Sequence, residues 1–248
     1  MKVLIALATY NRPVITHLCL QNLQSVRSDE VKLVVYDDAS TAYSKETLLE
    51  FADDVVRFER NGGIERSRAK AIRDFVYRYT DFDLIYFTDN DAIHDPKFID
   101  IVRSVGAWQR SRSEILPFSL YSTLFHNRPE NLISESGMFV VLKTIPGISQ
   151  CYTREMAEII VDALNGSADF ESTYGWDYIY TMILNRSCLN TKVSFVEHFA
   201  RDKHEAGMHS ANSGSGPDAL LDFERDRALN PTPFLVEIRD QIIEKILN

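Results

Sequence analysis

Short apolar runs alternate with amphipathic segments along the first hundred residues. The apolar runs have the length of buried strands and are Lys2–Ala8, Val31–Tyr36, Val55–Phe58 and Leu84–Phe87. The segments with helical spacing of apolar residues are Pro13–Val26, Ser44–Phe51, Ile64–Tyr79 and Pro96–Trp108. Strands that alternate with helices at this spacing are typical of βαβ units. The pattern therefore predicts an α/β fold with a mostly parallel central sheet flanked by helices.

The second half of the chain is less regular. It contains three strand-like runs, Phe118–Tyr121, Met138–Leu142 and Lys192–Val196. Helical patterns cover Thr153–Leu164, Trp176–Leu189 and Pro231–Leu247. The stretch near 207–218 is rich in Gly and Ser and lacks apolar periodicity, which predicts a mobile loop. No repeat or linker divides the chain, so we expect residues 1–248 to form a single domain.

Composition narrows the class of protein. The 248 residues are 45% hydrophobic and 25% charged, as in soluble globular proteins. The net charge of -9 argues against a nucleic-acid partner. Cys19, Cys151 and Cys188 form no C-x-x-C pair, so we expect free thiols in a reducing compartment. No segment is long and apolar enough to be transmembrane, and we expect a cytoplasmic protein, free or held at a membrane by a partner.

Two carboxylates follow the strand-like run Leu84–Phe87. Asp89 and Asp91 are separated by one residue, and side chains two apart on extended backbone point the same way. Carboxylate oxygens at the end of a strand are suitable ligands for Mg²⁺ or Mn²⁺. The alternative is an Asp/Asn turn without a metal, because both residue types favour turns. The pair by itself leaves both interpretations open.

Five motifs occur in a fixed order along the chain. They are Thr9-Tyr10-Asn11-Arg12-Pro13, Asp37-Asp38-Ala39-Ser40-Thr41, Asn61-Gly62-Gly63 with Arg68, Thr88-Asp89-Asn90-Asp91, and Gly175-Trp176-Asp177. This order resembles the glycosyltransferases of GT-A fold, and most of all the inverting glycosyltransferase family 2. The resemblance implies a Rossmann-like nucleotide-diphospho-sugar transferase fold. It also implies that residues 1–110 bind the nucleotide sugar, that 111–230 bind the acceptor, and that 231–248 add a terminal helix.

The resemblance assigns the first three motifs to the nucleotide. Thr9, Tyr10 and Arg12 would cradle the base and ribose, with Tyr10 stacking on the base. Asp37 would accept the base N3–H while Asp38 braces its loop.

The third motif and the helix after it would receive the phosphates. Asn61 and Gly62 allow close approach of the backbone, and the helix N-terminus with Arg68 favours phosphate. The structural alternatives are a strand-to-helix turn for Tyr10, an Asp-rich turn for Asp37 and Asp38, and a solvated basic helix face for Arg66 and Arg68.

The remaining motifs would carry the metal and the chemistry. Asp91 is the expected direct ligand of Mn²⁺ or Mg²⁺, and Asp89 would contact ribose, the metal or its water, with Asn90 between them. Asp177 is the expected general base, although Trp176 replaces the usual Glu and helix capping is an alternative role for Asp177.

Other residues compete for two of these roles. Asp169 and Glu171 are alternatives to Asp177 as the base. His198, His204 and His209 cluster with basic residues, and His209 is the expected further metal ligand, with His204 second.

The implied activity is metal-dependent transfer of a sugar, with inversion, from a nucleotide-diphosphate donor. A UDP-sugar is the expected donor, and a glycan, lipid-linked or protein-linked hydroxyl is the expected acceptor. The alternatives are a retaining mechanism, a sugar-phosphate nucleotidyltransferase, or an inactive nucleotide- or carbohydrate-binding module. A nucleotidyltransferase usually carries a Gly-rich basic loop after its first strand, which Ala8–Pro13 does not provide.

Overall fold

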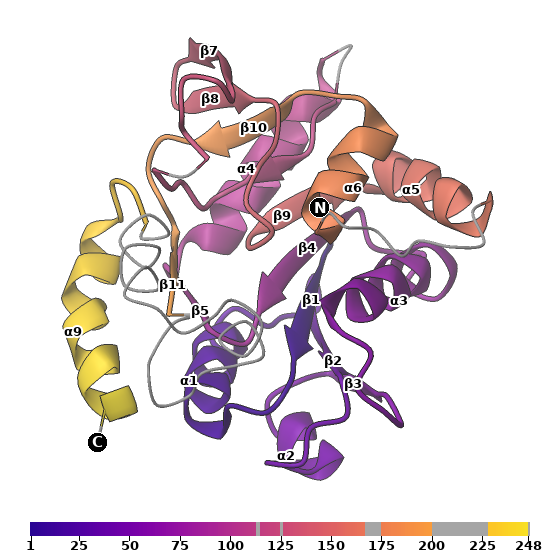
Figure 1. Ribbon diagram of the computed structural model, residues 1–248, viewed down its shortest axis with the longest axis vertical. Coiled ribbons are helices and arrows are strands. Elements are labelled where there is room, and N and C mark those ends of the chain that lie inside the picture. The colour runs from indigo at the N-terminus through magenta and orange to yellow at the C-terminus, as the bar shows by residue number, and fades with distance from the viewer. Residues whose placement is uncertain (113–114, 125, 167–174, 200–227, 248) are drawn as a thin grey trace.

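The computed structural model describes residues 1–112, 115–124, 126–166, 175–199 and 228–247 (Figure 1). The strands are β1 Val3–Thr9, β2 Val31–Asp37, β3 Asp54–Arg57, β4 Leu84–Asp89, β5 Ala92–His94, β6 Phe118–Ser119, β7 Leu132–Ser136, β8 Phe139–Leu142, β9 Gln150–Thr153, β10 Cys188–Thr191 and β11 Val196–His198. The helices are α1 Pro13–Gln24, α2 Lys45–Leu49, α3 Ile64–Tyr77, α4 Phe98–Arg110, α5 Arg154–Gly166, α6 Trp176–Leu184 and α9 Pro233–Leu247.

One large sheet organises the described part of the chain. Its nine strands lie in the order β3-β2-β1-β4-β9-β6-β10-β8-β7. The predicted parallel arrangement holds from β3 through β4. The second half makes the sheet mixed, because β9 runs antiparallel to both β4 and β6. Strands β4, β6 and β10 therefore point the same way, and their carboxyl ends share one edge of the sheet.

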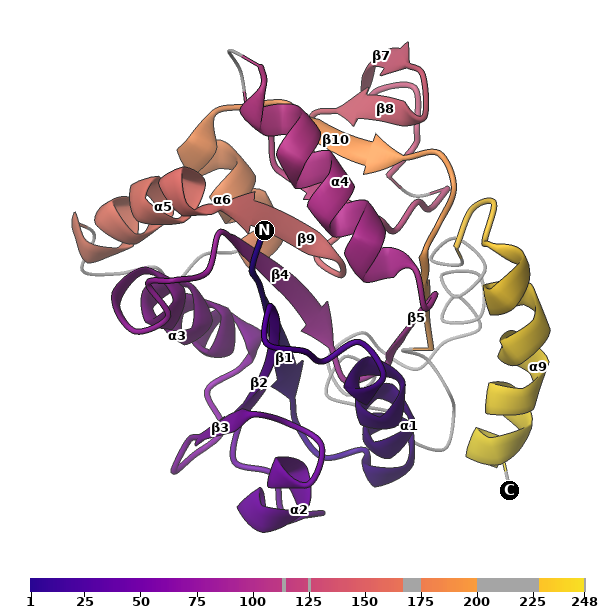
Figure 2. The same cartoon turned by 180° about the vertical axis from the view of Figure 1, so that it is seen from behind.

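Helices cover both faces of this sheet, as the α/β pattern predicts. Alternate residues of β1 enter different cores: Val3, Ile5 and Leu7 pack on the side of α1 and α4, whereas Leu4 and Ala6 pack on the side of α3, α5 and α6. Figures 1 and 2 show α1 and α3 on opposite sides of β1 and β4. A strand buried on both faces needs apolar residues at successive positions, which explains the continuous run.

The second half corrects two predictions. The helix predicted over Trp176–Leu189 ends at Leu184, because Asn185 adopts left-handed backbone with φ 47° and caps it. The residues that follow form β10, and β11 at Val196–His198 replaces the strand predicted over Lys192–Val196.

Three further strands escaped prediction because they are short. β5 and β9 pair with distant parts of the chain, such as Ala92 with His198, whereas β7 forms a local hairpin with β8. Local periodicity carries no signal for such pairings.

The remaining fold-level predictions concern thiols and the membrane. All three cysteines are free and buried, as expected. None of the helices in the described part of the chain combines the length and apolar character that a bilayer-spanning segment requires.

Arg154 connects the second half of the chain to the first. Its guanidinium group donates to main-chain carbonyls at and after the end of α3, those of Phe75, Val76, Tyr79 and Phe82.

We expect Arg154→Gln to lower the free energy of unfolding by about 1.5–3 kcal/mol in urea denaturation, because these carbonyls lose a charged donor. Arg110→Gln, which removes an exposed pair with Asp83, is the matched control and should cost under about 1 kcal/mol. Equal losses in the two variants would contradict the connecting role of Arg154.

Candidate active site

The carboxyl ends of β1, β2, β3 and β4 bring their loops together, as the alternating pattern predicts. The loop after β1 contacts the loop after β2, since the Asn11 amide donates to Ser40 Oγ at 2.8 Å. The same loop reaches the end of β4, where Arg12 pairs with Asp91. β11 adds a segment from the far end of the chain, because the Phe199 amide donates to the Asp91 carbonyl at 2.8 Å.

Asp91 is the most strongly engaged carboxylate of this cluster. Its Oδ2 atom lies 2.5 Å from Arg12 Nη1 and 3.2 Å from His198 Nε2. Burial alone would raise the pKa of Asp91, but the charges of His198 and Arg12 and their hydrogen bonds hold it well below its usual range. Asp91 is therefore an anion whose charge is balanced by two side chains that come from distant segments.

The donor atoms around Asp91 are suitable for a divalent cation. Oδ1 of Asp91 is buried and has no hydrogen-bond partner among the described residues. A carboxylate oxygen beside an imidazole is a suitable ligand pair for Mn²⁺ or Mg²⁺. Within the described ranges, however, no three His, Cys, Asp or Glu side chains are grouped to hold a metal ion. The site thus provides a partial ligand set.

Asp89 has a different partner from Asp91. β4 ends at Asp89, so the strand alternation that would align the two side chains does not extend to Asp91. Asp89 Oδ1 pairs with Arg68, whose guanidinium is almost completely buried. Arg68 also donates to the Ala6 carbonyl at 3.0 Å and to the Thr88 carbonyl at 2.8 Å.

Aromatic rings enclose the Arg68 guanidinium. It lies 4.9 Å from the ring centroid of Phe87 and 4.8 Å from that of Trp176. Both distances are within the range of a cation–π interaction. Trp176 thus packs the first turn of α6 onto the end of β4. The resemblance leads one to expect Glu at this position.

The loop after β1 has an unusual backbone. Asn11 and Arg12 are consecutive left-handed residues, with φ 53° and 61°. This conformation is uncommon outside glycine, and Asn tolerates it best. Asn11 Oδ1 accepts hydrogen bonds from the amides of Thr41 and Ala42, and the Asn11 carbonyl accepts one from Tyr43 Oη at 2.9 Å. These bonds hold the backbone that points Arg12 at Asp91.

Asn90 supports the same loop from the other side. Its Nδ2 atom donates to Thr16 Oγ1 at 2.7 Å and to the Asn11 carbonyl at 3.3 Å. The residue between the two carboxylates therefore positions the β1 loop, and it is itself buried.

The two acids after β2 differ in their contacts. Asp38 accepts hydrogen bonds from the amides of Gly62 and Gly63, at 3.0 and 2.7 Å, and pairs with Arg66. Gly63 has φ 85°, which favours glycine at this approach. Asp37 is completely buried, accepts from the Ser40 amide at 3.0 Å and lies 3.3 Å from an Arg57 nitrogen.

Asp177 lies in the first turn of α6, half-buried. Burial raises its pKa, although the amides of Tyr178 and of Asp177 itself oppose the shift. The loop before β9 passes over this carboxylate, since a Cβ on Gly147 would lie 3.4 Å from Asp177 Oδ2. A carboxylate with a raised pKa is a better proton acceptor than an ordinary aspartate.

The other predicted residues lie around the same edge of the sheet. Thr9 is buried and shares a hydrogen bond with Tyr43, Tyr10 is half-buried, and Asn61 is exposed. Several predictions fall outside the described residues: His209, its runner-up His204, the alternatives Asp169 and Glu171, and the loop near 207–218. Sequence reasoning did not choose His198, because only the pairing of β5 with β11 brings it to Asp91.

Comparison with known proteins agrees with this architecture. The sequence model of the family described as "Glycosyl transferase family 2" matches residues 4–121, which include every strand end up to Asp91. No curated protein matches the sequence.

The comparison with solved structures agrees with the GT-A fold. TarS residues 1–349 from S. aureus, in complex with UDP-GlcNAc, superpose with a TM-score of 0.58 at 18% identity, over 100% of this chain and 67% of that one. The mannosyltransferase PcManGT from Pyrobaculum calidifontis, in complex with GDP-Man and Mn²⁺, gives 0.54 at 15% identity, over 99% of this chain and 73% of that one. Identities this low show the shared fold.

The pair between the buried Arg68 guanidinium and Asp89 can be tested by stability alone. We expect Arg68→Met to lower the free energy of unfolding by about 3–5 kcal/mol, since it leaves Asp89 and two carbonyls without their cation. Adding Asp89→Asn should recover part of this loss in a double-mutant cycle.

Arg103→Met is the control for that cycle. It removes a pair with the exposed Glu30 and should cost about 0–1 kcal/mol. If Arg68→Met cost no more than Arg103→Met, or if Asp89→Asn deepened its loss, the buried pair would not stabilise the end of β4.

Proposed function

We propose that the protein transfers a sugar from a nucleoside-diphosphate donor to a hydroxyl acceptor, with inversion at the anomeric carbon and with Mn²⁺ or Mg²⁺ bound. The observation that carries the proposal is Asp91, a buried carboxylate just after β4 whose Oδ1 atom has no hydrogen-bond partner among the described residues. Open α/β sheets bind their ligands beyond the carboxyl ends of their strands. The family 2 domain over residues 4–121 supports a sugar donor at this position.

Asp91 and His198 are the residues that would hold the cation. His198 takes the part for which we expected His209, and Asp89 remains a predicted contact to the ribose, the metal or its water. Two protein ligands are few for Mn²⁺ or Mg²⁺, but such ions at phosphate sites commonly take further ligands from substrate phosphates and water. When bound, the ion would neutralise the negative charge that develops on the leaving diphosphate.

Arg12 has a second role beside this site. Its guanidinium occupies the space next to Asp91 Oδ2 and balances that charge while the donor is absent. With the donor bound, Arg12 would pair with a phosphate oxygen, a group that a guanidinium matches in shape.

The nucleotide would lie over the loops that follow β1, β2 and β3. Tyr10 is the predicted stacking partner of the base, and Thr9, Asn61 and Gly62 remain predicted contacts. Arg68 is too enclosed to reach a base from its present position, and it would act through Asp89. We favour UDP, and the GDP-Man complex of the archaeal mannosyltransferase makes GDP the first nucleotide to test beside it.

Asp177 is the proposed general base. In its ionised form it would accept the proton of the acceptor hydroxyl as the oxygen attacks the anomeric carbon from the face opposite the diphosphate. The raised pKa of Asp177 makes the carboxylate a stronger base at neutral pH. Trp176 and Arg68 link the first turn of α6 to Asp89, so donor and base are held by one packed unit.

Nucleotide binding provides the first test. We expect calorimetry to detect UDP or GDP binding that requires Mn²⁺, and we expect Asp91→Ala to weaken it at least about tenfold, because the cation loses its carboxylate ligand. Asp81→Ala, which removes an exposed carboxylate, should bind as the wild type does. Binding of no nucleoside diphosphate, or metal-independent binding unchanged in Asp91→Ala, would refute the proposed donor site.

The role of Asp177 provides the second test. Asp177→Asn should reduce the transfer rate by about 10²–10⁴-fold without weakening donor binding. It should not lower the melting temperature at pH 7, because the raised pKa means that folding disfavours the ionised form. For the same reason, the wild-type rate should fall on the acid side at a pH above the usual aspartate pKa of about 3.9.

The matched control for this test is Asp100→Asn. Asp100 also lies in the first turn of a helix, α4, and is exposed. Its variant should keep the wild-type transfer rate. Full transfer activity in Asp177→Asn with intact donor binding would exclude Asp177 as the base.

A further inference from the structure

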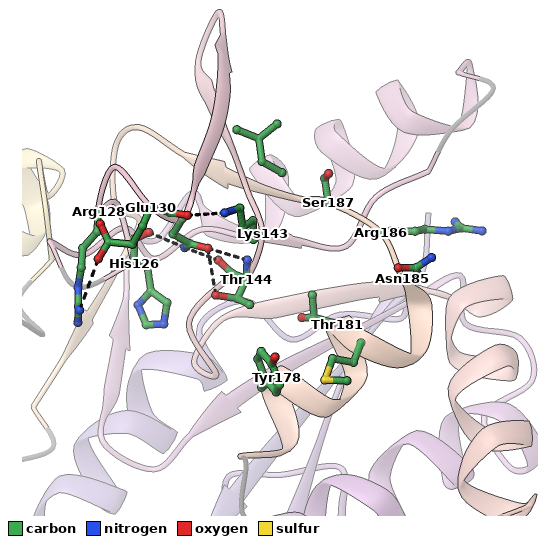
Figure 3. Close-up of a pocket in the computed structure, with 13 residues that line it drawn as sticks. His126, Arg128, Glu130, Lys143, Thr144, Tyr178, Thr181, Asn185, Arg186 and Ser187 are labelled. Carbon is green, nitrogen blue, oxygen red and sulfur yellow. Dashed lines mark hydrogen bonds and ion pairs between the residues drawn. The ribbon is translucent and has the colours of Figure 1, made fainter.

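A pocket of about 580 Å³ lies beside α6, away from the carboxylates of β4. Tyr178, Thr181 and Met182 of α6 form one wall, and residues 126–131 with Lys143 and Thr144 form the opposite wall. Figure 3 shows Tyr178 and Thr181 projecting from α6 toward the segments that carry His126 and Thr144. Its volume is within the range of small-molecule sites.

The wall opposite α6 is held in shape by Asn131. The Asn131 Nδ2 atom donates to the His126 carbonyl at 2.6 Å and to the Thr144 carbonyl at 3.0 Å. Its Oδ1 atom accepts from the Thr144 amide at 3.0 Å. These bonds tie the 126–131 turn to the segment after β8, so the pocket exists without a ligand.

The pocket begins within one helical turn of Asp177. Tyr178 is the next residue along α6, and Thr181 Oγ1 donates to the Asp177 carbonyl at 2.9 Å. The segment that carries Lys143 and Thr144 continues to Gly147, which passes over the Asp177 carboxylate. One turn of helix rises about 5.4 Å, so a molecule in the pocket could present a hydroxyl to Asp177.

Among the described residues that line this pocket, cationic side chains outnumber acidic ones, in a chain whose net charge is -9. Arg128, Lys143 and Arg186 border it, with Glu130 as the acid. Lys143 Nζ donates to the main-chain carbonyl of Glu130 at 2.7 Å, and among the described residues it has no carboxylate within ion-pair distance.

Each of the two arginines has a carboxylate nearby. Arg128 is 3.9 Å from the Glu130 carboxylate, and Arg186 is 3.5 Å from that of Glu155. Burial lowers the pKa of His126 to about 4, so its ring is neutral at pH 7 and the positive charge belongs to the lysine and arginines.

Apolar surface accompanies this charge. Tyr178 and Met182 are exposed, at 39% and 60%, and both face the pocket. An aromatic face beside polar groups suits the C–H face of a sugar ring, and lysine with arginine suits a phosphate.

We propose that this pocket binds a phosphate-bearing carbohydrate, the acceptor whose hydroxyl is presented to Asp177. The phosphate lies toward Lys143 and Arg128, and the sugar ring lies on Tyr178. The acceptor role rests on the proposed function, because it requires transfer at Asp177. The binding of a sugar phosphate in the pocket does not, and it can be measured without donor or turnover.

The experiment is a titration of the ¹⁵N-labelled full chain with glucose 6-phosphate, followed by NMR, with glucose as the neutral control. Amide shifts should concentrate at Thr144, Tyr178 and Thr181, and glucose 6-phosphate should bind at least tenfold more tightly than glucose. Lys143→Gln should weaken binding of the phosphate sugar at least tenfold and leave that of glucose unchanged. Added salt should weaken binding of glucose 6-phosphate and leave that of glucose unchanged.

Lys97→Gln is the matched control, since Lys97 is an exposed lysine at the start of α4. It should bind glucose 6-phosphate as the wild type does. Both lysine variants should retain wild-type binding of UDP with Mn²⁺, which shows that the fold and the donor site are intact.

The outcomes separate this inference from the proposed function. UDP binding with no shifts in the pocket, or with an affinity for glucose 6-phosphate that Lys143→Gln leaves unchanged, would overturn the pocket and spare the donor site. Pocket binding without binding of any nucleoside diphosphate would refute the acceptor role together with the proposed transfer reaction. Binding of both UDP and glucose 6-phosphate, with Lys143→Gln weakening only the binding of glucose 6-phosphate, supports the proposal.

Discussion

The organisation of this protein depends on neutralising two carboxylates at the end of β4. Asp89 is paired with Arg68 from α3, and Asp91 with Arg12 from the loop after β1 and His198 from β11. Each partner comes from a different segment, so these contacts form only when the sheet, α3 and β11 are all in place. A buried ion pair gives little net stability, but loss of one partner is costly. The same requirement concentrates reactive groups at one point of the fold.

Arg68 extends this dependence into the second half of the chain. Its contact with Trp176 seats the first turn of α6 against β4 and thereby places Asp177 near the proposed donor site. The C-terminal helix contributes in a similar way. Arg239 of α9 pairs with Glu197 of β11, next to His198. The proposed base and the histidine beside Asp91 are therefore both positioned by residues that take no part in the chemistry.

The site has two regions with different electrostatics. Around β4 the charged groups form matched pairs. Around the pocket at α6 the positive charges of the described residues exceed the negative ones, which favours an anionic occupant. Helix α6 borders both regions, because Trp176 contacts Arg68 and Tyr178 lines the pocket, and Asp177 is the residue between these two in the sequence.

The sequence by itself determined the first four parallel strands, the helices on both faces of the sheet, and the polar loops at one edge. These follow from local periodicity and from the direction that parallel strands share. Only the tertiary structure decided that Asp89 and Asp91 contact different cations, that Asn90 braces the β1 loop, and that His198 lies at Asp91. It also decided where α6 ends and that β9 enters the sheet antiparallel. Such features depend on contacts between residues far apart in the chain, for which the local pattern of apolar and polar residues carries no signal.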